Sequence, residues 1–178
     1  SGLSLKNVYL ISTLAMTIFF TSTVLLPITM HELSYNESQI GQLLAFISLV
    51  AVVTAGFMPK IIKWLNEPKV LALAFFAFAL SYICFTQTST LLLTLGALLI
   101  GIGFGFSIPL LNHMTVELSA ANVRGRNLSY FTMAVFSGQF FTSFMEYMPG
   151  GAHNVFIMCS VFSVIISMVL FGKGRKTV

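Results

Sequence analysis

The chain has 178 residues, of which 57% are hydrophobic and only 8% are charged, and its formal net charge is +4. An average soluble domain has about 25% charged residues, so this composition excludes a water-soluble globular protein and indicates an integral membrane protein. The positive charge does not indicate nucleic-acid binding, because a membrane topology accounts for the distribution of the basic residues along the chain.

Six segments are long and apolar enough to cross a bilayer, which takes about 20 mostly apolar residues. Only residues 86–89 separate the third segment from the fourth, so these two must be antiparallel neighbours. The sequence therefore predicts one all-α domain over residues 1–178, with membrane spans at about 8–30, 39–58, 70–85, 90–112, 128–148 and 154–171.

The Lys and Arg residues all fall on one side of this six-span topology. They lie before the first span, between the second and third, between the fourth and fifth, and after the sixth, at Lys6, Lys60, Lys63, Lys69, Arg124, Arg126, Lys173, Arg175 and Lys176. Membrane proteins concentrate Lys and Arg in their cytoplasmic loops. We therefore expect both termini in the cytoplasm and a location in the bacterial inner (plasma) membrane.

The first span carries a stripe of threonines. Thr13, Thr17 and Thr21 recur every four residues and so share one face of a helix. Such a stripe can line a substrate cavity, and a threonine can equally donate its hydroxyl to a carbonyl of its own helix. Both interpretations are open, and the three threonines are candidate cavity residues.

The second span carries a seam of small residues. Gly41, Ala45, Ser48 and Ala55 lie near one face, and Gly56 follows directly. Small residues let two membrane helices approach closely. We therefore expect this face to pack against another helix. The third span, in contrast, is apolar all round and the sixth is mostly apolar, and both accept lipid.

Glycine dominates the fourth span, where Gly96, Gly101, Gly103 and Gly105 precede Pro109. Each glycine would cost a water-exposed helix about 1 kcal/mol, so four in one helix favour a span inside a bundle. Gly101 and Gly105 form a small-xxx-small pair that admits another helix backbone. Whether the glycines serve packing alone, or also let the helix flex, is open.

The fifth span has a polar stripe made of Thr132, Gln139, Ser143 and Glu146. Gln139 is either a substrate contact or a hydrogen bond between helices. Glu146 is either a functional acid, for example in proton coupling, or a solvated group at the membrane boundary, because a carboxylate inside a membrane is costly. Gln139, Ser143 and Glu146 complete the candidate cavity residues.

Polar residues flank the loop between the fourth and fifth spans, where a cytoplasmic gate would close. A charge pair of Glu117 with Arg124 or Arg126 would hold one conformation closed, and the arginines could equally anchor lipid phosphates. The candidate gate residues are Asn112, His113, Glu117, Arg124 and Arg126.

The sequence offers no catalytic or metal-binding constellation. An intramembrane serine protease needs Ser and His at similar depth, and Ser107 is available, but all three histidines lie at span ends. The histidine spacing relative to Glu32 and Glu37 matches no metal-ligand motif, and Cys84 and Cys159 lie in apolar runs as buried thiols. We expect no enzymatic activity, no metal and no cofactor.

The two halves of the chain are similar to each other in pattern. The first span ends with Pro27 followed by His31, Glu32, Leu33 and Ser34, and the fourth with Pro109 followed by His113, Glu117, Leu118 and Ser119. In each triplet the first helix is polar and the third is apolar. This pattern favours a three-plus-three inverted repeat, which is common among transporters.

The chain resembles the C-terminal six-helix half of a major facilitator superfamily transporter. The triplet character is one reason. The loop of residues 56–63 is similar to the family pattern G-x-x-x-D-R-x-G-R-R and keeps Gly56, although Lys60 and Lys63 replace its acid and second glycine. In addition, the Arg-Gly pair at 124–125 leads into Gly-Gln-Phe at 138–140, as in the eleventh helix of many bacterial members.

The resemblance implies half of a twelve-helix fold, with a cavity near the bilayer midplane between two halves that rock against each other. Spans one and four would line the cavity, spans two and five would contact the other half, and spans three and six would lie outside. The other half would be a separate chain, a second copy or absent.

The implied activity is ion-coupled (proton-coupled) secondary transport of a small solute by alternating access, as a symporter or antiporter, and the aromatic, weakly polar interior favours export of an amphipathic compound. The alternative is an autonomous six-helix protein, or an isolated half, that self-associates without transport. The implied partners are the lipid bilayer, a small-molecule substrate and a second six-helix half.

Overall fold

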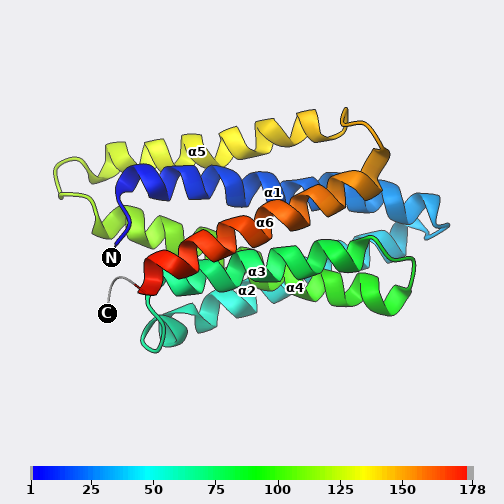
Figure 1. Cartoon of the computed structure of the whole chain (residues 1–178), viewed down its shortest axis with the longest axis horizontal. Helices are drawn as coiled ribbons and strands as arrows, with labels where there is room; N and C mark the ends of the chain where they lie inside the picture. Colours follow the sequence, from blue (N-terminus) through cyan, green and yellow to red (C-terminus); the bar gives the residue numbers. More distant parts are fainter. Residues whose placement is uncertain (1, 176–178) are drawn as a thin grey trace.

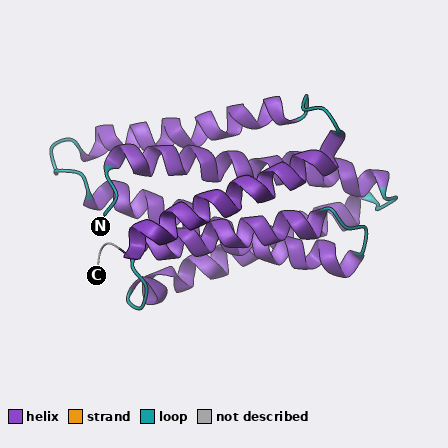
Figure 2. Cartoon of the chain, viewed as in Figure 1, coloured by secondary structure: helices purple, strands orange, loops and turns teal. Residues whose placement is uncertain are grey.

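The computed structural model describes residues 2–175, which form a bundle of six helices joined by short loops, with no strand in that range (Figures 1 and 2). Lys176 lies outside the described residues. The helices are α1 (Leu5–Glu32), α2 (Glu37–Ile62), α3 (Glu67–Phe85), α4 (Thr90–Glu117), α5 (Arg124–Met145) and α6 (Gly151–Arg175). The predicted all-α fold is confirmed.

Local capping signals set where several helices begin. The Asn36 side chain accepts a hydrogen bond from the Gln39 backbone N–H, and the Gln39 side chain accepts one from the Asn36 backbone N–H, which makes a capping box at the start of α2. Asn66 caps α3 in the same sense, accepting from the Lys69 N–H, and Pro68 occupies the first turn. These caps satisfy backbone donors that would otherwise lack a partner.

Most helices are longer than the predicted spans, because polar residues continue them beyond the apolar segment. The clearest case is α4, which runs on past Asn112 to Glu117. In contrast, α5 begins at Arg124 and ends at Met145, three residues before the predicted end, so Glu146 lies just after its last turn. Five helices are long and apolar enough to cross a membrane. The exception, α5, contains many Ser, Thr and Gln residues and lies alongside α1 (Figure 1).

The six helices form two layers. In the first, α1 and α4 are in contact at the centre, α5 packs on α1, and α2 packs on α4. In the second, α3 and α6 pack on each other, and α3 also packs on α4. The two triplets therefore place their members alike at the centre, with α1 and α4, and at the edges, with α2 and α5. The helices behind differ, because α3 packs on α4 while α6 makes little contact with α1. This arrangement fits half of a twelve-helix transporter fold.

The core is centred on α3, the helix that the sequence predicts to be apolar all round and to accept lipid. Its aromatic residues Phe75, Phe78, Tyr82 and Phe85 are fully buried against α4 and α6. What α3 exposes is a narrow apolar stripe, formed by Leu73, Phe76, Leu80 and Ile83. An apolar composition alone does not distinguish a lipid-facing helix from a core helix, because lipid and protein interior are equally apolar.

The helices alternate in direction, so α1 begins and α6 ends at the same end of the bundle (Figure 1). The α2–α3 and α4–α5 loops lie at that end as well. All the Lys and Arg residues within the described range belong to this end. The topology thus gathers the basic residues in one place, as the positive-inside interpretation requires.

Candidate functional site

The α1–α5 contact is hydrogen-bonded through threonine hydroxyls. Thr13 Oγ1 donates to the Ala134 carbonyl (3.0 Å), and Thr17 Oγ1 donates to the Gly138 carbonyl (3.2 Å). In return, Thr142 Oγ1 donates to the Thr17 carbonyl (3.3 Å). Gly138 makes this approach possible, because a Cβ at that position would lie 2.6 Å from the Thr13 carbonyl oxygen. These bonds fix the two helices in one register.

The threonine stripe, which the sequence leaves open as either a cavity lining or a set of bonds within the helix, makes hydrogen bonds inside the bundle. Thr13 and Thr17 also donate to carbonyls one turn earlier in α1, at 3.1 and 2.8 Å. Thr21 is fully buried and donates to the Thr17 carbonyl at 2.7 Å. Of the two interpretations open from the sequence, back-bonding to the helix is the one this structure has, joined by contacts to α5 that spacing alone does not reveal.

The glycines of α4 lie on two faces. Gly101 and Gly105 face α2: a Cβ would lie 2.8 Å from the Ile47 carbonyl oxygen in the first case and 2.6 Å from the Ala51 carbonyl oxygen in the second. Because these obstacles are backbone atoms, α2 can approach this closely only opposite glycine. The small-xxx-small pair thus sits at the α2–α4 contact.

The other two glycines face α3. A Cβ at Gly96 would lie 2.6 Å from the Phe85 ring, and a Cβ at Gly103 would lie 2.5 Å from the Phe78 ring. The buried phenylalanines of α3 therefore fill the space that these glycines leave open. The helix α4 is therefore packed between α2 and α3, and it presents one pair of glycines to each of them.

Pro109 lies inside α4 without ending it, since the helix continues to Glu117. Proline has no N–H, so the carbonyl four residues earlier, at Gly105, lacks its usual helical partner. A missing helical bond thus coincides with a glycine in the middle of α4. Bends in membrane helices are typically found at such positions.

The small-residue seam of α2 does not pack against another helix of the described chain. Gly41, Ala45 and Ser48 are exposed, and a Cβ at Gly41 or Gly56 would meet nothing within 4 Å. The helix turns a different face toward α4, with Ile47, Val50, Ala51 and Thr54 buried. The expectation of close packing at Gly41 and Gly56 is therefore not met within this chain.

The polar stripe of α5 points away from α1. Thr132 and Ser143 are exposed, and Gln139 is half-buried with no side-chain hydrogen bond in the described residues. Glu146 is an exposed residue immediately after the helix, and not within it. The edge helices α2 and α5 therefore both present small or polar side chains outward.

The predicted pair of Glu117 with an arginine is not formed. Glu117 instead contacts His113, one turn earlier in α4, with 3.2 Å between Oε1 and Nε2. The reason is that α4 continues to Glu117 and holds the two residues at i and i+4 on one face, while Arg124 and Arg126 belong to α5. Asn112 and both arginines are exposed.

A buried polar cluster near the same end was missed by the sequence reasoning. Asn127 Nδ2 donates to Ser119 Oγ (2.8 Å), which in turn donates to the Thr115 carbonyl (2.6 Å). The Tyr9 hydroxyl donates to the Asn127 carbonyl (3.1 Å). The cluster ties α1, the end of α4 and the start of α5 together. Its only sequence signal is an Asn inside the first turn of a helix.

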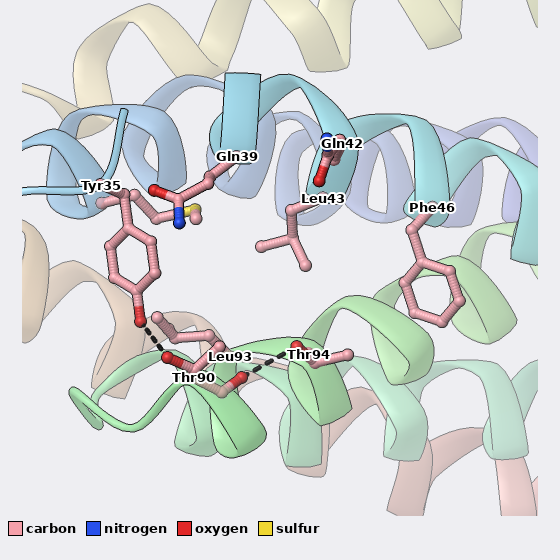
Figure 3. Close-up of a pocket in the computed structure, with 9 residues that line it drawn as sticks. Tyr35, Gln39, Gln42, Leu43, Phe46, Thr90, Leu93 and Thr94 are labelled. Carbon is pink, nitrogen blue, oxygen red and sulfur yellow. Dashed lines mark hydrogen bonds between the residues drawn. The ribbon is translucent and has the colours of Figure 1, made fainter. Parts of the chain in front are cut away.

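A pocket of about 300 Å³ opens between α2 and α4 at the end opposite the basic residues (Figure 3). The Tyr35 hydroxyl is 2.5 Å from Thr90 Oγ1, and Thr94 Oγ1 donates to the Thr90 carbonyl (2.8 Å). Gln39 is engaged in the capping box, whereas Gln42 makes no side-chain hydrogen bond in the described residues. The lining residues are Met30, Tyr35, Gln39, Gln42, Leu43, Phe46, Thr90, Leu93 and Thr94.

This pocket combines apolar walls with an amide and hydroxyls, which is the usual character of a small-molecule site. Sequence reasoning missed it because its two walls lie far apart in the chain. The available signal was the pair of glutamines three residues apart in an otherwise apolar segment. Within the described residues, no three His, Cys, Asp or Glu side chains lie together as metal ligands would.

Comparison with known proteins gives one result. A family model described as Major Facilitator Superfamily matches residues 8–177, which is almost the whole chain. A search of curated proteins finds no match.

Proposed function

Because this chain belongs to the Major Facilitator Superfamily of membrane transporters, we propose that it forms one half of a secondary transporter that exports a small amphipathic compound by alternating access. The layer α5–α1–α4–α2 faces the second half. That half is another six-helix domain, either a second copy or a different chain.

The observation that carries this proposal is the unpartnered character of both edge helices. Gly41 and Ser48 on α2, and Gln139 and Ser143 on α5, are small or polar and turn away from the bundle. The Ser48 hydroxyl donates to the Leu44 carbonyl of its own helix at 3.2 Å, but Gln139 and Ser143 make no side-chain hydrogen bond in the described residues, and such groups find no partner in hydrocarbon. A second half that covers both edges supplies those partners and encloses a cavity between the halves.

The movement is assigned to α4. The carbonyl of Gly105 lacks its helical bond opposite Pro109, and Gly101 and Gly105 give α4 a close backbone contact with α2. The helix bends at this point while the hydroxyl-bonded pair α1–α5 moves as one body. Asn112, His113, Glu117, Arg124 and Arg126, at the basic end, form the gate region on that side.

The substrate class follows from the charges that the site lacks. All five acidic residues of the chain lie at or just beyond helix ends, and no Lys or Arg lies in the middle of a described helix. A site formed by these helices therefore selects through shape, aromatic contact and neutral hydrogen bonds. The rings of Phe19 and Phe104, with centroids 4.3 Å apart, line the α1–α4 contact. Proton coupling, in this proposal, uses an acid of the second half.

The test is a transport assay in vesicles that contain the chain and a neutral amphipathic fluorescent dye, with an imposed pH gradient. We expect gradient-dependent dye movement that falls at least tenfold in Gln42→Leu and Gln139→Leu. Gln87→Leu, which changes an exposed glutamine in the α3–α4 loop, is the matched control and should retain full activity. Equal activity in all three variants would contradict the site.

The mass of the detergent-solubilised protein separates the two forms of the proposal. A mass of two copies supports transport by a homodimer. A mass of two copies without dye movement favours the alternative, which is self-association without transport. A single copy with no dye movement supports the form in which the second half is a different chain. In that case co-expression with the missing half should restore dye movement.

A further inference from the structure

A groove of about 460 Å³ runs between α3 and α6 on the side of the bundle remote from α2 and α5. Small residues form its floor: Ala72, Ser167 and Gly172. The Ser167 hydroxyl donates to the Ala72 carbonyl at 2.7 Å, so the floor has no unsatisfied polar group there. The groove belongs to neither the pocket between α2 and α4 nor the edges proposed to meet the second half.

The walls of the groove are apolar and open to the surroundings. Leu73 and Phe76 of α3 are 46% and 49% exposed, and Met168 and Phe171 of α6 are 68% and 47% exposed. Side chains of this kind on the outside of two membrane helices face hydrocarbon. The groove is therefore shaped to take an extended apolar chain.

One end of the groove is positively charged. Arg175 lines it, and its guanidinium carbon lies 5.4 Å from the centroid of the Phe171 ring, so the aromatic wall holds the cation over the groove. Lys69 of α3 packs on the neighbouring Gly174, where a Cβ would be 2.8 Å from Lys69 Cγ, but Lys69 does not line the groove. Glu67, at the same end of α3, does not line the groove.

We propose that this groove is a binding site for an anionic phospholipid, whose acyl chain lies between α3 and α6 and whose phosphate contacts Arg175. A lipid is favoured because it matches both the positive charge and the apolar walls. A free phosphate would contact Arg175 but would make no favourable contact with the apolar walls. The cation lies at the basic end of the bundle, the end that the positive-inside rule places among lipid headgroups. Basic pockets between membrane helices on that side recognise acidic headgroups.

The test is native mass spectrometry of the delipidated full chain after addition of phosphatidylglycerol or phosphatidylcholine with identical acyl chains. We expect one retained phosphatidylglycerol and about fivefold weaker retention of phosphatidylcholine, since one Arg near an anionic surface is worth about that factor. Arg175→Gln should abolish the preference but keep some binding. Gly172→Leu should block both lipids, because a Cβ there meets nothing within 4 Å and the added side chain fills the groove without a clash.

Lys63→Gln is the matched control, because it removes one positive charge at the same end of the bundle but outside the groove. It should retain the headgroup preference. The proposal is overturned if the wild-type chain retains both lipids equally, if Lys63→Gln loses the preference as fully as Arg175→Gln, or if inorganic phosphate alone displaces the retained lipid. Helix content of each variant, measured by circular dichroism, confirms that the compared chains are folded.

Discussion

Replacing Gly105 by alanine should destabilise the bundle through α2. The added Cβ would lie 2.6 Å from the Ala51 carbonyl oxygen and 2.7 Å from Thr54 Cβ, whereas ordinary contacts begin at 3.4 Å. The backbone of α2 must therefore retreat by about 0.8 Å, a gap that forfeits a quarter to a half of the dispersion energy of the contacts it opens. The same retreat loosens the neighbouring contact at Gly101.

The expected net loss is about 1–2 kcal/mol. Overpacking of a well-packed contact costs about 1–3 kcal/mol, and the better helix propensity of alanine returns up to about 1 kcal/mol. The measurement is the free energy of unfolding by dodecyl sulfate titration in mixed micelles, followed by circular dichroism.

Gly56→Ala provides the matched control, because it makes the same chemical change in the partner helix at a position where a Cβ meets nothing within 4 Å. It should be neutral or stabilising by up to about 1 kcal/mol. Gly105→Ala should therefore lower the unfolding midpoint, whereas Gly56→Ala should leave it unchanged or raise it. The reasoning fails if Gly105→Ala is as stable as the wild type, or if Gly56→Ala loses as much stability as Gly105→Ala.

Three further substitutions test the polar contacts. Thr17→Val removes the hydroxyl bonded to the Gly138 carbonyl and should lower the unfolding free energy by about 0.6–1.7 kcal/mol in the same titration; an unchanged value would show that this bond is dispensable. Asn127→Ala removes the buried amide bonded to Ser119, at a cost of about 1–3 kcal/mol, and should speed trypsin cleavage in the α4–α5 loop; unaltered cleavage would contradict its role there. Glu117→Gln breaks an exposed pair and should change stability by less than about 1 kcal/mol; a larger loss would mean that Glu117 pairs elsewhere.

The helices could be predicted because their signals are local. Hydropathy over about 20 residues locates a span. The capping box of Asn36 and Gln39 is also a local signal, but the sequence reasoning missed it and placed the start of the second span at Gln39. The gathering of the Lys and Arg residues at one end could also be predicted. Successive spans alternate in direction, so every second loop lies at the same end of the bundle. Errors occurred where polar residues extend a helix beyond its apolar part, as at the end of α4.

The direction in which each face points could not be predicted. Glycine spacing predicts that a helix approaches Gly101 and Gly105, but not that the helix is α2, nor that Gly96 and Gly103 turn to α3. The Thr17 hydroxyl illustrates the same limit: four-residue spacing fits a cavity and a helix contact equally, and only the position of Gly138 decides between them.

The candidate pocket depends on a contact that no local pattern contains. Tyr35 meets Thr90 across 55 positions of the chain, so the pocket exists only once α2 and α4 are docked. The pair of His113 with Glu117, in contrast, is a contact within one helix, and it could be predicted once α4 is known to continue to Glu117. The Asn127–Ser119 bond could not be predicted, because it depends on the turn between α4 and α5.

The even number of helices has a consequence for how such a unit can be duplicated. Because α1 begins and α6 ends at the same end of the bundle (Figure 1), a second copy joined to it in tandem would insert with the same orientation, and the connecting segment would not have to cross the bilayer. A bundle with an odd number of helices would invert its neighbour. Head-to-tail fusion of two such units is therefore topologically neutral, and the two bundles would be related by rotation about an axis along the membrane normal, as parallel repeats are.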